Sequence, residues 1–290
     1  MKKVAPPRID DIAIIQELSL NSALDKTSYP HLRQQLTLVE DAYQDYINSV
    51  GNAWRVSNTN LSDKLRIALI KHYKQPPKIV DFLEALRKSS PESCPMCGGF
   101  KPSTLDHVLP KEDFPVWSIF SKNLVPACSC NSVRGTALKG APVTRARVLH
   151  PYFDDCLSER LLTTRFKHDQ DFKWVKAELD YADSNHPEIA SIKYHAKHIV
   201  VKNDIDSWLR AQMNKLKEFP ANVIKNLPRK RAVDVARLNE ALDELLESYD
   251  EQCGSLNNWH SILIHGLLNA AFLHTWIVQR HNDCVRGRQQ

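Results

Sequence analysis

Four cysteines in two close pairs are the residues of this chain best suited to hold a metal ion. Two residues separate Cys94 from Cys97, a spacing at which one short turn aims both sulfurs at one ion. Only one residue separates Cys128 from Cys130, where two are usual. Four thiolates would complete a closed tetrahedral structural zinc site, with Cys156 as a substitute ligand. The alternative is a set of free, buried cysteines that act as small apolar side chains.

An acid–imidazole dipeptide, Asp106–His107, lies between the two cysteine pairs. In an extended segment neighbouring side chains point to opposite faces, so the two residues can serve two roles. The carboxylate can hold a hard divalent cation, and the imidazole can take a proton from water near neutral pH. An isolated Asp–His pair is more often part of an ordinary surface loop. Its place between the cysteines, followed by Asn123 and Asn131, favours a functional site.

These motifs occur in a recognisable order. Cys-x-x-Cys is followed by Leu-Asp-His-x-x-Pro-Lys, then Asn-Leu-Val-Pro, then Cys-Asn and the dipeptide Arg134–Gly135. Over about 45 residues, from Cys94 to Leu138, the segment resembles the HNH family of ββα-metal nucleases. The departure from the family pattern is the shortened Cys-x-Cys immediately before Asn131.

The resemblance implies a role for each polar residue of the segment. His107 matches the general base that activates water, and Asn123 matches the residue that braces the loop and orients the base. Asp106 and Asn131 match the protein ligands of a catalytic cation, Mg²⁺ or another divalent ion. Such a cation leaves coordination sites open for phosphate oxygens and water, as phosphodiester hydrolysis requires. The zinc would be structural, because a motif this short has little core of its own.

The implied activity is metal-dependent hydrolysis of DNA. The expected partner is double-stranded DNA, contacted through its phosphate backbone, and a single copy of the motif favours a nick over a double-strand break. Proteins with such helical flanks are similar to the HNH effector nucleases of bacterial antiphage defence systems, which implies other subunits as partners. The alternative is a non-catalytic zinc module that binds nucleic acid or a partner protein. That alternative explains the cysteines but leaves Asp106 and His107 unexplained.

Composition describes a globular chain of 290 residues, of which 42% are hydrophobic. With 8 glycines and 16 prolines, it favours helices joined by proline-marked turns. Seven cysteines, an odd number, fit metal use in a reducing cytoplasm better than a disulfide framework. We expect a cytoplasmic protein without membrane insertion, since no apolar segment follows the N-terminus and no clean apolar run is long enough to span a bilayer.

Positive charge gathers in the motif segment. Residues 94–147 hold seven Lys and Arg against three Asp and Glu, whereas residues 148–290 hold 19 against 20. A local positive field favours a polyanion such as DNA, although an excess of four charges is also typical of an ordinary solvated surface. The candidate phosphate contacts, each of which could equally be a solvated side chain, are Lys111, Lys122, Arg134 and Lys139.

The expected fold is mainly α with a small α+β insert: a zinc-stapled ββα-metal motif flanked by helical regions. The predicted divisions are a helical region at 1–90, the motif at 91–143 and a mainly helical region at 144–290. Apolar periodicity predicts helices near residues 9–24, 31–50, 61–73, 79–86, 204–219, 233–249 and 259–278.

Within the motif, we expect a strand at 103–109 carrying Asp106 and His107, a loop at 110–122, a return strand at 124–126 and a helix at 131–138. Two further strands are predicted near 161–166 and 172–179. His150 lies in a stretch similar to one that follows the motif in some bacterial HNH proteins. It is a candidate to approach the site, with a packed loop histidine as the alternative.

Overall fold

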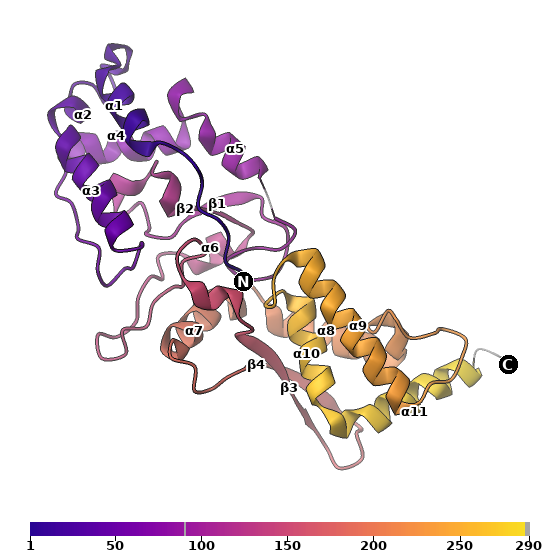
Figure 1. Ribbon diagram of the computed structural model, residues 1–290. Coiled ribbons are helices and arrows are strands. Elements are labelled where there is room, and N and C mark those ends of the chain that lie inside the picture. Colours follow the sequence, from indigo (N-terminus) through magenta and orange to yellow (C-terminus); the bar gives the residue numbers. More distant parts are fainter. Residues whose placement is uncertain (90, 288–290) are drawn as a thin grey trace.

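The computed structural model describes residues 1–89 and 91–287. About half of these residues are helical, and the strands form two small antiparallel sheets. The N-terminal helices lie at one end of the molecule, and the C-terminal helices with the second sheet lie at the other (Figure 1). The first sheet, which belongs to the candidate motif, lies between them.

The N-terminal helices pack through apolar stripes. On α3, Val39, Tyr43 and Tyr46 recur at helical spacing and are buried. The helix predicted over 31–50 is wrong at one point, because it breaks at Gln35, whose side chain bonds both the hydroxyl and the backbone N–H of Ser62. The helices of this region are α1 (Asp11–Leu20), α2 (His31–Gln34), α3 (Leu36–Asn48), α4 (Asp63–Lys74) and α5 (Phe82–Lys88).

The motif segment folds as an antiparallel hairpin followed by one short helix. Strand β1 (Thr104–His107) pairs with β2 (Leu124–Ala127), so that Asp106 lies opposite Val125 and His107 opposite Leu124. Helix α6 (Cys130–Arg134) follows. It is shorter than the predicted 131–138, because it ends at Gly135, whose positive φ of 59° turns the chain away. The β–β–α order expected for the motif is present.

The C-terminal region combines a hairpin with helices. Strands β3 and β4 pair from Leu162 to Tyr181, with α10 packed on β3 and α8 on β4. The helix at Ile189–Val201, whose second half is a π-helix, has no counterpart among the predicted elements. The elements are β3 (Leu162–His168), β4 (Val175–Tyr181), α7 (Ile189–His195), η6 (Ala196–Val201), α8 (Ile205–Glu218), α9 (Val235–Cys253), α10 (Trp259–Asn269) and α11 (Ala271–Gly287).

The single helix predicted over 259–278 is wrong. The chain bends by 100° between α10 and α11, and two side chains near the bend bond carbonyls of α10. Asn269 Nδ2 donates to the His265 carbonyl at 2.8 Å, and His274 Nε2 bonds the Leu267 carbonyl at 2.9 Å. Among the described residues, no one helix has both the length and the apolar character to cross a membrane, and only the bent α10–α11 pair passes by composition.

The motif segment is shared between two large apolar cores, and Leu105 and Leu124 of its strands form a small third cluster with Leu83 of α5. Val108, Val125 and the four cysteines join the C-terminal core, the cluster built from β3, β4 and α8–α11. Leu109, Trp117 and Phe120, from the same segment, join the N-terminal core built from α1, α3 and α4. The motif therefore has no separate core, and the flanking regions together determine how its strands lie.

Candidate functional site

The four cysteines predicted as zinc ligands come together in one buried cluster. Their sulfurs all lie within 4.8 Å of one another. Cys94 Sγ is 3.6 Å from Cys130 Sγ, and Cys97 Sγ is 3.4 Å from Cys128 Sγ. Zinc–sulfur bonds of about 2.3 Å in a tetrahedron place neighbouring sulfurs about 3.8 Å apart, whereas a disulfide brings them to about 2 Å. The cluster is therefore able to hold a zinc ion, and the shortened second pair reaches it.

Neighbouring elements fix the cluster in place. Gly98 adopts a φ of 74°, and a Cβ there would lie 2.0 Å from the Asn257 carbonyl oxygen, so only glycine fits the turn after Cys97. Asn203 Nδ2 lies 3.4 Å from Cys97 Sγ and 3.6 Å from Cys128 Sγ, where it can donate to thiolate charge. Cys156 lies outside this cluster, and burial raises the pKa of its thiol to about 12.

Asp106 projects from β1 toward a buried arginine on α6. Arg134 Nη1 is 3.3 Å from Asp106 Oδ2, and both side chains are almost completely buried. That contact is an ion pair without hydrogen-bond geometry, and Asp106 Oδ2 and Arg134 Nη1 have no hydrogen bond at all. Burial raises the pKa of Asp106 to about 6, although the charges of Arg134 and Lys111 act to lower it. The carboxylate is thus desolvated and has an oxygen without a hydrogen-bond donor, as a cation ligand would.

His107 is held in one orientation by the loop that follows it. Its Nε2 donates to the Ser118 carbonyl oxygen at 2.9 Å, so Nδ1 is the unprotonated nitrogen of the neutral ring. The Tyr73 ring meets the imidazole edge-on, with centroids 4.3 Å apart. Burial lowers the pKa of His107 to about 3, against the effect of its bond to Ser118. The imidazole is therefore neutral at pH 7 and able to accept a proton at Nδ1.

Asn123 lies beneath the loop between the strands, and its carboxamide makes four hydrogen bonds. Oδ1 accepts from the Leu109 N–H at 2.8 Å and from the Tyr46 hydroxyl at 2.9 Å. Nδ2 donates to the Leu109 carbonyl at 3.0 Å and to the Trp117 carbonyl at 3.2 Å. These bonds close the loop that carries Ser118, and the bracing role of Asn123 stays a prediction.

Asn131 stands at the start of α6 and faces the same strand as Asp106. Its Nδ2 donates to the Leu105 carbonyl at 3.1 Å and reaches the Thr104 hydroxyl at 3.4 Å. Among the described residues no donor bonds Oδ1 of Asn131, so this oxygen is available to a ligand. A second oxygen ligand from this side chain would suit Mg²⁺, which prefers oxygen donors.

Asp106, His107 and Asn131 line one cavity of about 510 Å³. Arg134 and Lys111 also lie on its wall, and each is paired with an acid: Arg134 with Asp106 at 3.3 Å and Lys111 with Glu112 at 2.9 Å. The three residues that the sequence predicted to act together are thus brought together, while the four cysteines do not line this cavity and Asn123 lies behind it. The arrangement offers oxygen ligands, a neutral imidazole and cationic side chains around a space open to solvent.

The four candidate phosphate contacts lie in different surroundings. Lys111 lines the cavity, but Lys122 pairs with Asp11 at 2.8 Å and Lys139 lies over the Trp54 ring. Arg134 is buried and bonds the His107 carbonyl at 2.6 Å, so it is not the solvated cation that its surroundings in sequence suggest. Tyr73 also lines the cavity, against His107, and no local pattern in the sequence indicates that position.

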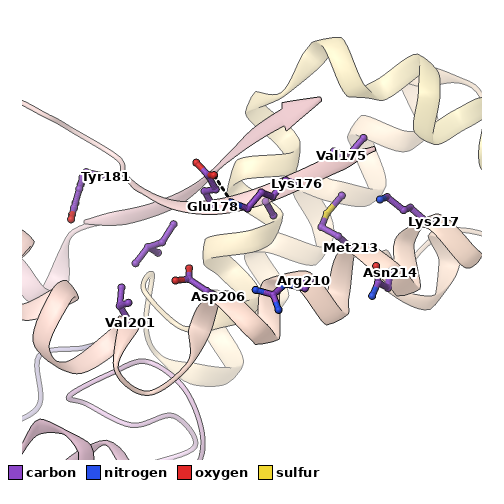
Figure 2. A pocket seen from close by; sticks show the side chains of 12 residues that line it. Val175, Lys176, Glu178, Tyr181, Val201, Asp206, Arg210, Met213, Asn214 and Lys217 are labelled. Carbon is purple, nitrogen blue, oxygen red and sulfur yellow. Dashed lines mark hydrogen bonds and ion pairs between the residues drawn. The ribbon is translucent and has the colours of Figure 1, made fainter. Parts of the chain in front are cut away.

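A second cavity, of about 440 Å³, lies between β4 and α8 (Figure 2). Lys176 and Glu178 of β4 line it, as do Arg210 and Lys217 of α8. Glu178 pairs with Lys176 at 2.9 Å, so part of the charge is already neutralised. None of the predicted site residues lines this cavity. Its cationic side chains can therefore serve as control positions for those of the first cavity.

Comparison with known proteins gives one short similarity. The chain is 39% identical over 69 residues to the protein ea31 of Escherichia phage lambda. This match spans 23% of each chain, so it covers about a quarter of either protein. No model of a known protein family matches the chain, and no solved structure matches it.

Proposed function

We propose that this protein is a divalent-cation-dependent endonuclease of HNH type that hydrolyses phosphodiester bonds in DNA. The observation that carries the proposal is the cavity where the carboxylate of Asp106, the imidazole of His107 and the carboxamide of Asn131 meet. The separate cysteine cluster, able to hold zinc, supplies a structural metal centre apart from this cavity.

Each cavity residue has a task in that reaction. A cation held by Asp106 and Asn131 would supply positive charge to the scissile phosphate and to the leaving oxygen. His107 Nδ1 takes a proton from the attacking water, and the Ser118 carbonyl holds the ring while the imidazolium forms. Burial is the main cause of the low pKa of His107, and the charges of Lys111 and Arg134 add to it. The negative charge of a bound phosphate would act to raise this pKa, and the positive charge of the cation would act to lower it.

The expected product is a nick in double-stranded DNA. One cavity of this kind handles one strand at a time, and Lys111 on its wall suits contact with the sugar–phosphate backbone. The similarity in sequence to effector nucleases of antiphage defence systems extends the proposal to a defence role with partner subunits. That extension rests on the resemblance alone.

The test is cleavage of supercoiled plasmid by the purified protein with Mg²⁺, Mn²⁺ or no added divalent ion, together with its zinc content. We expect nicking that depends on the added ion and falls to a small residual rate in His107→Ala, with the zinc content unchanged. Lys217→Ala, in the second cavity, is the matched control for Lys111→Ala, which should weaken plasmid binding.

Two results would contradict the proposal. If His107→Ala nicks as fast as the wild type, the general base is misassigned. If no added ion produces nicking while the protein retains zinc and binds DNA, the chain is a non-catalytic zinc module. The buried cysteine cluster is compatible with that alternative too.

A further inference from the structure

The hydroxyl of Tyr46 joins two buried polar side chains from distant parts of the sequence. It lies 2.9 Å from Asn123 Oδ1 and 2.9 Å from His150 Nε2. Tyr46 comes from α3, Asn123 precedes β2, and His150 follows the motif segment. All three side chains are buried, so water does not compete for these hydrogen bonds.

The chemistry of the groups fixes the direction of each hydrogen bond. The Tyr152 N–H donates to His150 Nδ1 at 3.2 Å, so the proton of the neutral ring is on Nε2. Burial lowers the pKa of His150 to about 3, and the ring is neutral at pH 7. His150 Nε2 therefore donates to the Tyr46 oxygen. The one hydroxyl proton of Tyr46 goes to Asn123 Oδ1 at 2.9 Å, a closer acceptor than the Lys122 carbonyl at 3.4 Å.

This direction determines which way the Asn123 carboxamide faces. Oδ1 must accept from Tyr46 and from the Leu109 N–H, which leaves both protons of Nδ2 for the Leu109 and Trp117 carbonyls. A reversed carboxamide would oppose donor to donor at Tyr46 and at Leu109. The loop that these bonds close presents the Ser118 carbonyl to His107 Nε2 at 2.9 Å.

The packing around Tyr46 leaves little room for other arrangements. A Cβ on Gly51 would lie 2.6 Å from His150 Cδ2 and 2.9 Å from Tyr46 Cε1. The Trp117 ring packs edge-on against Tyr46 at 5.4 Å, and its Nε1 donates to the Ala42 carbonyl at 3.0 Å. The loop is therefore attached to α3 through both Trp117 and the hydroxyl of Tyr46.

We propose that Tyr46 and His150 are positioning residues for the base His107, acting through Asn123 and the loop that carries Ser118. Both side chains are buried and neither lines the cavity, so a role for them would be exerted through Asn123 and the loop. The inference rests on the proposed nuclease activity and extends it to two side chains outside the motif. Helix α3 thereby takes part in catalysis although it lies in the N-terminal region.

The test compares nicking kinetics of Tyr46→Phe with those of Tyr43→Phe. Tyr43 lies on the same face of α3, with its ring packed at 4.3 Å on Phe120, but its hydroxyl is outside this hydrogen-bond chain. We expect Tyr46→Phe to lower kcat about 10- to 100-fold with KM unchanged, because a displaced base loses rate without losing substrate contacts. Tyr43→Phe should nick at the wild-type rate.

A double-mutant cycle separates positioning from general loosening of the fold. If Tyr46 acts through His107, Tyr46→Phe causes no further loss of the residual rate in the His107→Ala background. His150→Gln keeps one donor and one acceptor and should retain more activity than His150→Leu.

The outcomes distinguish this inference from the activity on which it rests. A wild type that does not nick overturns both. A nicking wild type whose Tyr46→Phe variant is equally fast overturns the positioning role alone. The positioning role is also overturned if Tyr46→Phe lowers the nicking rate by the same factor in the wild type and in His107→Ala. The hydroxyl would then act independently of the base.

Discussion

Neutralising Arg134 should cost far more stability than an ordinary surface substitution. In Arg134→Met, the side chain keeps a similar length but loses its charge. Asp106 then has no cation against its buried Oδ2, and the carbonyls of His107 and Val108 lose the donor Nη2. Both partners are almost completely buried, so solvent does not screen this pair as it does a surface pair.

The magnitude follows from that burial. Removing one partner of a buried ion pair typically costs about 3–5 kcal/mol, because the remaining charge is left uncompensated. Asp106→Asn should cost a similar amount by stranding the guanidinium. The double variant contains neither charge, so its loss should be smaller than the sum of the two single losses by about 2 kcal/mol or more.

The assay is urea unfolding of the wild type, the two single variants and the double variant at pH 8. At this pH Asp106 of the wild type is ionised, since its pKa is about 6. Arg66→Met, at an exposed pair with Asp63, is the matched control and should change the free energy of unfolding by less than about 1 kcal/mol. Additive losses within about 0.5 kcal/mol would show that the two charges do not interact, and would refute the account of this contact.

Three further outcomes are expected. Cys97→Ser should lower the zinc bound per chain and the melting temperature, measured by metal analysis and calorimetry, whereas Cys284→Ser, far from the cluster, should change neither. Burial lowers the pKa of His195 to about 3, from 6.5 in the unfolded chain, so between these pH values the unfolded chain binds one more proton. The free energy of unfolding therefore falls as the pH falls below 6.5, by about 2 kcal/mol at pH 5. His195→Gln should weaken the pH dependence of urea unfolding. Trp117→Ala should cost about 3–5 kcal/mol in the same assay, because its ring is fully buried and its N–H is bonded to Ala42; a loss under 1 kcal/mol would contradict that packing.

The parts of the fold that could be predicted are those specified by neighbouring residues. The Cys94–Cys97 turn, the pairing of two short strands around Asp106, and the long helix with Leu238, Leu242 and Leu245 on one face all follow from spacing along the chain. The apolar positions of that helix recur at helical spacing. The helix ends at Gly254, whose backbone has the left-handed conformation.

The parts that could not be predicted depend on distant partners. Arg134 has the sequence surroundings of a solvated cation, and only the fold brings Asp106 against it. The bend at Ala270 falls in a stretch without proline, and the side chains of Asn269 and His274 bond carbonyls of α10 there. Tyr46 is one apolar-face residue among several on α3, and nothing local marks its hydroxyl as the one that meets Asn123.

The division of the hairpin between two cores has a consequence for engineering. If residues 91–143 were cut out and expressed alone, Val125 and the cysteines would lose one set of apolar neighbours, and Trp117 and Phe120 would lose the other. A transplant into a foreign scaffold would therefore have to carry α3 and the stretch around His150 as well. In this chain the smallest transferable unit is larger than the sequence motif.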